Sequence, residues 1–278
     1  MRTPVCAPCL TLAEARKMHD FLSHDMSRRW SGEDAGIQLF AKQVVDVLAR
    51  RKSNGLGDAV EPYLSEMTMA SFSVDPAAID SVVAKMLSAR VPPIAIVDHY
   101  IPAVARRLGK DWEDDTRGFV DVTIGTARLQ AVLRHLTSAL PARASGSAVR
   151  VLVAVPEGED HTLGAMVVAS RLRRDGHNVC LRLQTPLREL IGLARTCRFD
   201  AALVSAANVE RLEQLRTLLG SLKGALPAAS PVLLGGALAT REGDFAAETG
   251  ADAVTADMDT VVDRLQAINA MKCAKERA

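Results

Sequence analysis

The chain has 278 residues, of which 48% are hydrophobic and 24% are charged, a composition typical of a globular protein with a buried core. Its 34 Lys and Arg residues balance 33 Asp and Glu, and the net charge of +1 excludes a basic surface that binds nucleic acid through phosphates alone. The sequence contains no apolar run of about 18 residues and no signal-peptide pattern at its N-terminus. We therefore expect a cytoplasmic protein without a membrane-spanning helix.

The five cysteines do not form a disulfide framework, and we expect reduced thiols. Cys6 and Cys9 form a single C-x-x-C pair. Structural zinc takes four ligands, and no second pair follows at a suitable spacing. We interpret the pair as part of a variable N-terminal segment, residues 1–33, with metal binding or redox chemistry as the alternative.

Residues 34–140 are predicted to form a helical domain. Apolar residues recur at helical spacing over Ala35–Arg51, which ends in basic residues. Further along, Asp75 followed by Pro76 is typical of an N-cap and a first helical position, and therefore predicts the start of another helix.

Two more helices are predicted before the end of this domain. The first covers Ile94–Leu108, ends at Gly109 and is followed by a loop that contains Trp112. The second covers Phe119–Ala139. Small residues, proline and glycine over residues 139–148 then mark a domain boundary.

After this boundary, short apolar runs alternate with helical segments. Each run fits a strand that is buried on both faces. The alternation predicts a flavodoxin-like, doubly wound sheet of five parallel strands over residues 150–272, so that the fold class is a helical bundle cap followed by an α/β domain. The predicted strands are Arg150–Val155, Val179–Leu183, Ala201–Ser205, Pro231–Leu234 and Ala251–Thr255, and the predicted helices are Leu163–Arg174, Leu187–Thr196, Val209–Leu222 and Met258–Met271.

Sheets of this kind bind ligands at the carboxyl ends of their strands. The loop after the first strand holds Glu159 and His161, and the helix that follows has Gly164 in its first turn. A carboxylate beside an imidazole is typical of a metal-binding histidine, because it fixes the tautomer of the ring. The same edge is predicted to carry a hydroxyl at the end of the third strand and a glycine pair after the fourth: Ser205, Gly235 and Gly236.

Each of these features also has a simpler interpretation. A histidine in a surface loop is often only exposed to solvent, a serine at a strand end often caps the next helix, and a glycine pair often forms a plain turn. The spacing of all three features along the chain is what favours a shared site.

The set Glu159-x-His161-x-x-Gly164, Ser205 and Gly235-Gly236 resembles the fingerprint of cobalamin-binding domains, which have Asp-x-His-x-x-Gly, Ser-x-Leu and Gly-Gly at similar intervals. The resemblance implies that hydroxo- or adenosylcobalamin binds in the base-off form, with His161 as the lower axial ligand of cobalt. It also implies that Glu159 orients the imidazole and that Thr162 lies beside the cofactor. Ser205 would contact the benzimidazole, and the slot for the nucleotide tail would be lined by Gly164, Gly235 and Gly236.

The chain departs from the family pattern at two positions. Glu159 stands in place of Asp, and Ala207 stands in place of Leu. A longer carboxylate still reaches an imidazole, and an alanine only loosens the packing. A flavodoxin-like domain without a ligand is the alternative.

The helical domain resembles the cap that precedes cobalamin domains in methionine synthase, corrinoid methyltransferase proteins and light-sensing cobalamin regulators. The resemblance rests on His99–Trp112, where a proline-containing helix leads to a glycine and a tryptophan. It implies that Trp112 covers the upper face of the corrin. A tryptophan packed within its loop is the alternative.

A cap followed by a cobalamin domain, without a catalytic module, is similar to the PpaA/AerR family of photosynthesis-gene regulators. This resemblance implies an antirepressor rather than an enzyme. Its cobalamin state, set by light or redox, would control binding to a repressor of the PpsR/CrtJ type, so that DNA is reached only through that partner. A corrinoid carrier for methyl transfer and an interaction module without cofactor are the alternatives, and the oligomeric state stays open.

Overall fold

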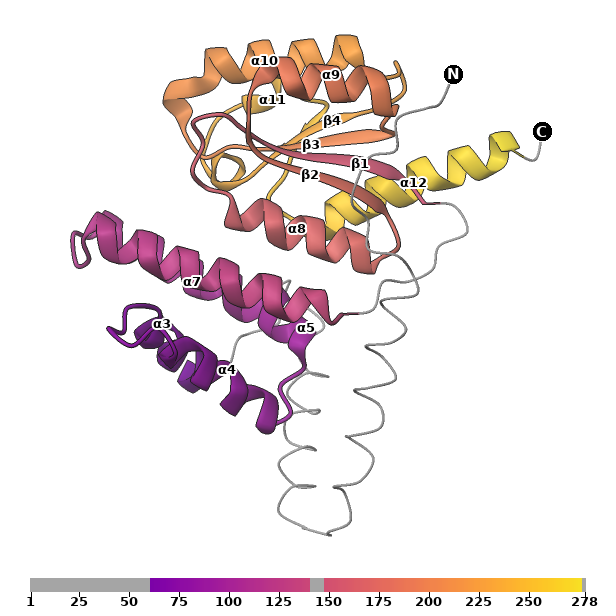
Figure 1. The fold of residues 1–278 in the computed structure, drawn as a ribbon. Coiled ribbons are helices and arrows are strands. Elements are labelled where there is room, and N and C mark those ends of the chain that lie inside the picture. Colours follow the sequence, from indigo (N-terminus) through magenta and orange to yellow (C-terminus); the bar gives the residue numbers. More distant parts are fainter. Residues whose placement is uncertain (1–60, 141–147, 277–278) are drawn as a thin grey trace, which may run out of the picture. The chain divides into compact units, whose positions relative to one another are not determined.

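A computed structural model describes residues 61–140 and 148–276, which belong to one compact unit. They form a helical bundle (residues 61–140) followed by an α/β region (residues 148–276), which confirms the predicted fold class (Figure 1). The predicted helix Ala35–Arg51 and the Cys6–Cys9 pair lie outside the described residues. Within these ranges, every helix is too short or too polar to cross a membrane.

The helical bundle consists of α3 (Glu61–Ser71), α4 (Ala78–Ser88), the continuous segment α5 (Pro93–Ala95), η1 (Ile96–Tyr100) and α6 (Ile101–Glu113), and finally α7 (Phe119–Ser138). Large apolar side chains from each part fill its core, among them Met67, Met86 and Leu129, which are fully buried. Helix α4 begins at Ala78, two residues later than predicted. Asp75 instead accepts a hydrogen bond from the Ala77 N–H at 2.9 Å and fixes the turn before the helix.

The predicted helix end at Gly109 is wrong. Helix α6 continues through Gly109 to Glu113, so that Trp112 lies in the last helical turn and not in a loop. The side chains of Val104 and Leu108 are buried in the bundle core and hold the helix in place. A glycine inside a helix costs only about 1 kcal/mol, which this packing offsets.

A π-helical turn lets the same helix pass a proline. In η1 the Ile101 N–H donates to the Ile96 carbonyl, five residues back, immediately before Pro102. A proline ring inside an α-helix clashes with the carbonyl four residues earlier and lacks the N–H to bond it. The wider turn gives the ring room, so the helix continues past Pro102, as the predicted helix Ile94–Leu108 requires.

The α/β region is built around a five-stranded parallel sheet. Its strands are β1 (Arg150–Pro156), β2 (Asn178–Thr185), β3 (Ala201–Ser205), β4 (Val232–Gly235) and β5 (Ala253–Val254), in the order β2-β1-β3-β4-β5. This order is that of flavodoxin-like sheets, with the switch point between β1 and β3. Strand β2 is longer than predicted and β5 is shorter.

The helices of this region cover both faces of the sheet (Figure 1). One face carries α8 (Leu163–Arg174) and α12 (Met258–Glu276), and the other carries α9 (Leu187–Cys197), α10 (Leu212–Ala225) and α11 (Phe245–Thr249). Two short 3-10 turns, η2 (Val209–Arg211) and η3 (Ala237–Thr240), precede α10 and α11. In β1, Val151 and Val153 pack toward α8, whereas Leu152 and Ala154 pack toward α10. Burial on both faces therefore explains the unbroken apolar run in the sequence.

Candidate functional site

The loop after β1 begins directly after Pro156, the last residue of the strand. Pro156 has no N–H to continue the ladder, and the register between β1 and β2 shifts at this residue. Gly158 follows with φ +79°, a left-handed conformation that turns the chain away from the sheet. We call residues 157–162 the His161 loop. It carries three predicted site residues: Glu159, His161 and Thr162.

Glu159 holds the imidazole of His161 in one orientation. Its side chain is only 5% exposed, and its Oε1 lies 2.5 Å from Nδ1 of His161. The same oxygen accepts a hydrogen bond from the His161 N–H at 3.1 Å, and Oε2 accepts one from the Ala207 N–H at 2.8 Å. Both carboxylate oxygens are therefore fixed, one to the histidine and one to the chain just after β3.

These hydrogen bonds set the charge of the pair. Burial raises the pKa of the Glu159 carboxyl, but the bonds from the His161 ring, from the Ala207 N–H and from the His161 N–H outweigh it and lower the pKa to about 2. The hydrogen bond to Glu159 raises the pKa of the His161 imidazole, and burial opposes it with a smaller effect. Glu159 is thus ionised at neutral pH and accepts the Nδ1 proton.

Nε2 is the nitrogen of His161 that is left available. The side chain is 65% exposed, and nothing in residues 61–140 and 148–276 is hydrogen-bonded to Nε2. An imidazole whose Nδ1–H is held by a carboxylate presents a more basic lone pair at Nε2, the arrangement found in metal-ligating histidines. In the described ranges, no group of three or more His, Cys, Asp or Glu side chains could hold a metal ion by itself.

The ends of β3 and β4 lie against each other at the same edge. Ser205 pairs with Gly235, and the Ala206 N–H donates to the Gly235 carbonyl at 3.0 Å. Gly236 has φ +87° and ψ −168°, a conformation that is essentially restricted to glycine. A Cβ at this position would lie 2.4 Å from the Ala206 carbonyl oxygen. Gly236 is therefore required by the close approach of the two backbones.

Ser205 does not cap the helix that follows it. That role belongs to Asn208, whose Oδ1 accepts a hydrogen bond from the Glu210 N–H at 2.8 Å. The Ser205 side chain instead lies beside the glycine pair, since a Cβ at Gly236 would come 2.8 Å from its Oγ.

Gly164 contrasts with Gly236 because packing does not require it. A Cβ at Gly164 would meet no atom within 4 Å, although the residue lies in the first turn of α8. The open space beside this backbone suits a ligand that approaches it closely. Thr162 is different again, because its buried Oγ1 accepts a hydrogen bond from Nε2 of Gln130 on α7 at 2.9 Å.

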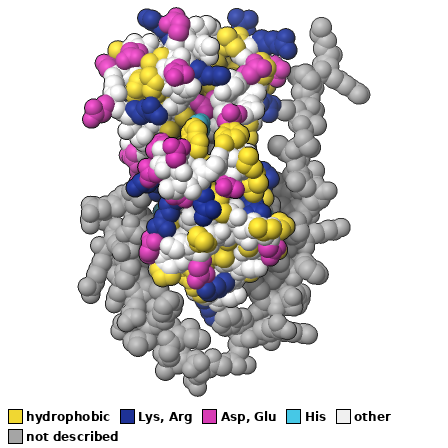
Figure 2. Space-filling view, turned by 90° about the vertical axis from the view of Figure 1, so that its left-hand side faces the viewer, with side chains coloured by type: hydrophobic (Ala, Val, Ile, Leu, Met, Phe, Trp, Pro, Cys, Tyr) yellow, Lys and Arg dark blue, Asp and Glu magenta, His cyan; other side chains and the backbone are white. Residues whose placement is uncertain are grey.

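Trp112 lies on the bundle, 50% exposed, near other exposed apolar side chains along the chain. Phe119, Val120 and Ile124, in the first turns of α7, are 71%, 67% and 45% exposed. These three are not among the predicted site residues, although they fall outside the helical stripe that includes Leu129 and could have been found on that ground. Hydrophobic side chains also gather next to the histidine side chain visible in Figure 2.

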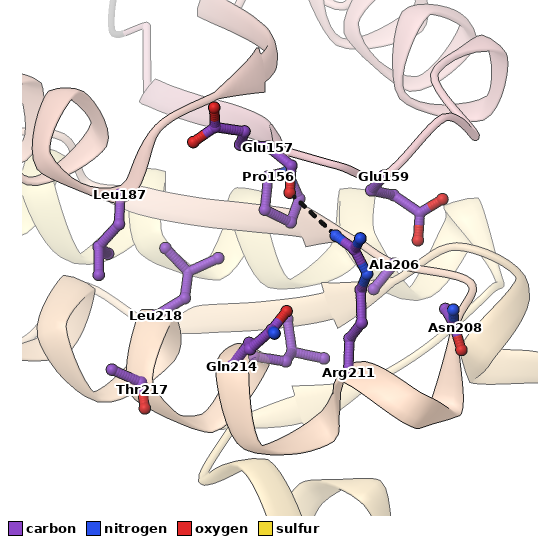
Figure 3. Close-up of a pocket in the computed structure, with 11 residues that line it drawn as sticks. Pro156, Glu157, Glu159, Leu187, Ala206, Asn208, Arg211, Gln214, Thr217 and Leu218 are labelled. Carbon is purple, nitrogen blue, oxygen red and sulfur yellow. Dashed lines mark hydrogen bonds between the residues drawn. The ribbon is translucent and has the colours of Figure 1, made fainter.

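A cavity of about 310 Å³ lies at the switch point between β1 and β3 (Figure 3). Arg211 extends from η2 over Gly158 and donates to the Glu157 carbonyl at 3.2 Å, which fixes the His161 loop from this side. The cavity is lined by Pro156, Glu157, Glu159, Leu187, Ala206, Asn208, Arg211, Gln214, Leu215, Thr217 and Leu218. This is the place where open parallel sheets bind ligands, and the volume is at the lower end for ligand sites.

Comparisons with known proteins place the α/β region in a family. Residues 149–265 match the family model of the B12 binding domain. The chain is 38% identical over 183 residues to an uncharacterised 20.5 kDa protein of the bchF-crtJ intergenic region in Rhodobacter capsulatus, which covers 65% of this chain and 95% of that protein. It is 29% identical over 206 residues to the HTH-type transcriptional repressor CarH of Myxococcus xanthus, which covers 73% of this chain and 67% of CarH.

The fold is also found among solved structures. The monomethylamine corrinoid protein of Methanosarcina barkeri superposes with a TM-score of 0.63 over 75% of this chain and 100% of its own, at 16% sequence identity. At this identity the likeness concerns the fold alone.

Proposed function

The chain belongs to the PpaA/AerR-type family of B12-binding-domain proteins, and from this premise we propose that it is a cobalamin-responsive regulator that acts through a repressor protein. In this proposal the cofactor binds base-off at the carboxyl edge of the sheet, and Nε2 of His161 is its lower axial ligand. The observation that carries the proposal is the exposed imidazole held at 2.5 Å by the buried carboxylate of Glu159.

The residues present fit a corrinoid. Among the described residues Nε2 of His161 has no hydrogen-bond partner, Glu159 fixes the tautomer of the ring, and the space beside Gly164 leaves room for a group that approaches the backbone. Bound cobalamin would supply a cobalt whose upper ligand responds to light or to redox state. Ser205 and the glycine pair would line the nucleotide tail, and Trp112 would cover the upper face.

The regulatory part of the proposal is supported by the relatives. One is named for its position between bchF and crtJ, and the other is a transcriptional repressor. With a net charge of +1, this chain is better suited to a protein partner than to DNA. We infer that the partner is a repressor of the PpsR/CrtJ type and that the state of the cobalamin shifts the equilibrium between binding and release.

Cobalamin uptake tests the first step. Purified protein is mixed with hydroxocobalamin and separated by gel filtration, and corrin absorbance is expected to elute with the protein. His161→Ala should lose most of this absorbance, because the axial ligand is removed. His135→Ala, which changes an exposed histidine on α7, is the matched control and should keep it. Equal uptake by both variants would show that His161 is not the ligand.

Repressor binding tests the second step. Immobilised PpsR/CrtJ-type repressor is incubated with the cofactor-free protein, the loaded protein in the dark and the loaded protein after illumination or reduction. Retention that differs between these states supports a regulator. Equal retention in all states, together with transfer of a methyl group to an added acceptor system from protein loaded with methylcobalamin, would favour the corrinoid carrier.

A further inference from the structure

The His161 loop is held by hydrogen bonds from several elements. Three bonds that involve a side chain come from the α/β region itself: Arg211 to the Glu157 carbonyl at 3.2 Å, the Ala207 N–H to Glu159 at 2.8 Å, and Gln184 to Asp160 at 2.7 Å. A fourth, from Gln130 to Thr162, comes from the helical bundle. Thr162 directly follows the histidine, so this bond connects α7 to the residue next to the proposed ligand.

The residues after Thr162 also belong to the bundle. Leu163 is 6% exposed and lies in the hydrophobic core of the bundle, and Met166 and Val167 pack against the same core. The first turn of α8 is therefore fixed by the helical bundle as well as by the sheet that it covers.

An ion pair connects the other end of α8 to the bundle. Both Nη2 contacts of Arg174 go to the carboxylate of Asp98 in η1, at 2.6 and 2.5 Å, and the two side chains are only 11% and 12% exposed. Helix α8 has 12 residues and is about 18 Å long. The bundle therefore contacts α8 at both of its ends, while Ala165 and Leu172 of the same helix pack against the sheet.

We propose that Gln130 is a positioning residue that couples the position of the helical bundle to the orientation of the His161 imidazole. The inference rests on the proposed function and adds the contact through which the bundle would act on the proposed ligand. When the bundle shifts, the bond to Oγ1 of Thr162 pulls on the residue next to His161, while Glu159 holds the ring to the backbone just after β3. The contact between imidazole and cobalt then depends on where the bundle sits.

The test compares Gln130→Met with Gln266→Met. Methionine keeps the length and helix propensity of glutamine but removes the donor, and Gln266 is an exposed glutamine on α12. The first readout is amide hydrogen exchange in the cofactor-free protein. Exchange at the His161 and Thr162 amides should accelerate about fivefold in Gln130→Met, the factor that corresponds to a hydrogen bond of about 1 kcal/mol. Exchange at the Ala207 amide should stay unchanged.

The second readout is the absorption spectrum of the loaded protein. The ratio of imidazole-bound to unbound cobalt should fall by about the same factor in Gln130→Met and in Thr162→Val. The double variant should resemble either single one, because both remove the same bond.

Two outcomes would overturn the inference separately from the proposed function. Unchanged exchange and an unchanged spectrum in Gln130→Met, with normal cobalamin uptake, would show that the bundle does not position the histidine. Wild-type protein that takes up no cobalamin would overturn the proposed function and the spectroscopic half of the inference. The exchange data would still decide whether Gln130 holds the loop.

Discussion

At the amino edge of the sheet, two aspartates connect neighbouring strands in the same way. Asp200, just before β3, accepts a hydrogen bond from the Arg150 N–H at 2.7 Å and donates its own N–H to the Arg150 carbonyl at 2.8 Å. Asp252, just before β5, makes the same pair of bonds with Val232, at 2.7 and 2.9 Å. Each carboxylate also forms an ion pair with a lysine, Asp200 with Lys272 and Asp252 with Lys223.

At the carboxyl edge, Glu159 repeats half of this arrangement with a different partner. Its carboxylate also accepts a hydrogen bond from the backbone near a neighbouring strand, but its second oxygen binds an imidazole that is 65% exposed. A lysine stays charged at neutral pH and neutralises the carboxylate in an ion pair. An imidazole bound through one nitrogen still has a second nitrogen that can bind a ligand. The comparison separates a carboxylate that serves stability from one that serves a ligand.

The largest expected effect comes from placing a side chain where the backbones of Gly236 and Ala206 approach each other at the carboxyl edge. Gly236→Ala introduces a Cβ at φ +87° and 2.4 Å from the Ala206 carbonyl oxygen. We expect the free energy of unfolding to fall by about 3 kcal/mol or more, as measured by urea denaturation. A variant as stable as the wild type would show that β3 and β4 do not need this close approach.

Gly164→Ala is the matched control and should separate stability from binding. A Cβ there meets no atom within 4 Å, so the free energy of unfolding should stay the same or rise by up to about 1 kcal/mol. Cobalamin uptake should nevertheless decrease, because the methyl group enters the proposed ligand space. Unchanged uptake would remove Gly164 from the site.

The next largest effects are expected when a carboxylate is replaced by an amide, first at the carboxyl edge and then at the amino edge. Glu159→Gln should lower the affinity for cobalamin about 10- to 100-fold, the usual result of losing the carboxylate behind a metal-binding histidine. The affinity is measured by titration of the corrin absorbance. A loss of stability without loss of affinity would make Glu159 equivalent to the aspartates of the amino edge.

Asp200→Asn applies the same exchange to the amino edge. The amide oxygen still accepts the Arg150 N–H, but the ion pair with Lys272 is lost, and the carboxylate is 16% exposed. We expect the protein to be less stable by about 1 kcal/mol in urea denaturation, with unchanged cobalamin affinity of the folded protein. Loss of affinity at normal stability would contradict the division between the edges.

The smallest effect is a pH dependence at the amino edge. Burial raises the pKa of Asp252, but the hydrogen bonds from Lys223 and from the Val232 N–H outweigh it, so the pKa lies below the usual 3.8. A lowered pKa in the folded state stabilises the protein above the unfolded value, and this stability is lost as the pH falls through the folded value. Because the side chain is 38% exposed, the contribution should be a few tenths of a kcal/mol. Asp252→Asn should flatten the stability curve below about pH 4, and an identical curve would contradict this role.

The strands and the His161 loop could be predicted because their signals are local. A buried parallel strand appears as a short apolar run, and a proline or glycine ends it, as Pro156 and Gly158 do. The end of α6 could not be predicted in this way. Gly109 has the same local signal as a helix terminus, and the packing of Val104 and Leu108 into the bundle favours a helix that continues.

Contacts between distant segments were out of reach for the same reason. Gln130 is an unremarkable polar residue in α7, and nothing near it in the sequence indicates Thr162. The reciprocal bonds of Asp200 and Asp252 likewise depend on strand order, which places the start of β1 beside β3 and the start of β4 beside β5. A single sequence shows the residue types at these positions but not which partner each one meets.

The attachment of α8 to the helical bundle determines which fragments of this protein can fold on their own. A fragment that begins at residue 148 contains every strand and the whole His161 loop, and the sequence marks a boundary there. Such a fragment would expose Leu163, Met166 and Val167 to water and leave the buried guanidinium of Arg174 without Asp98. We therefore expect the isolated sheet region to aggregate or to recruit another apolar surface, so that the smallest autonomous folding unit includes the bundle.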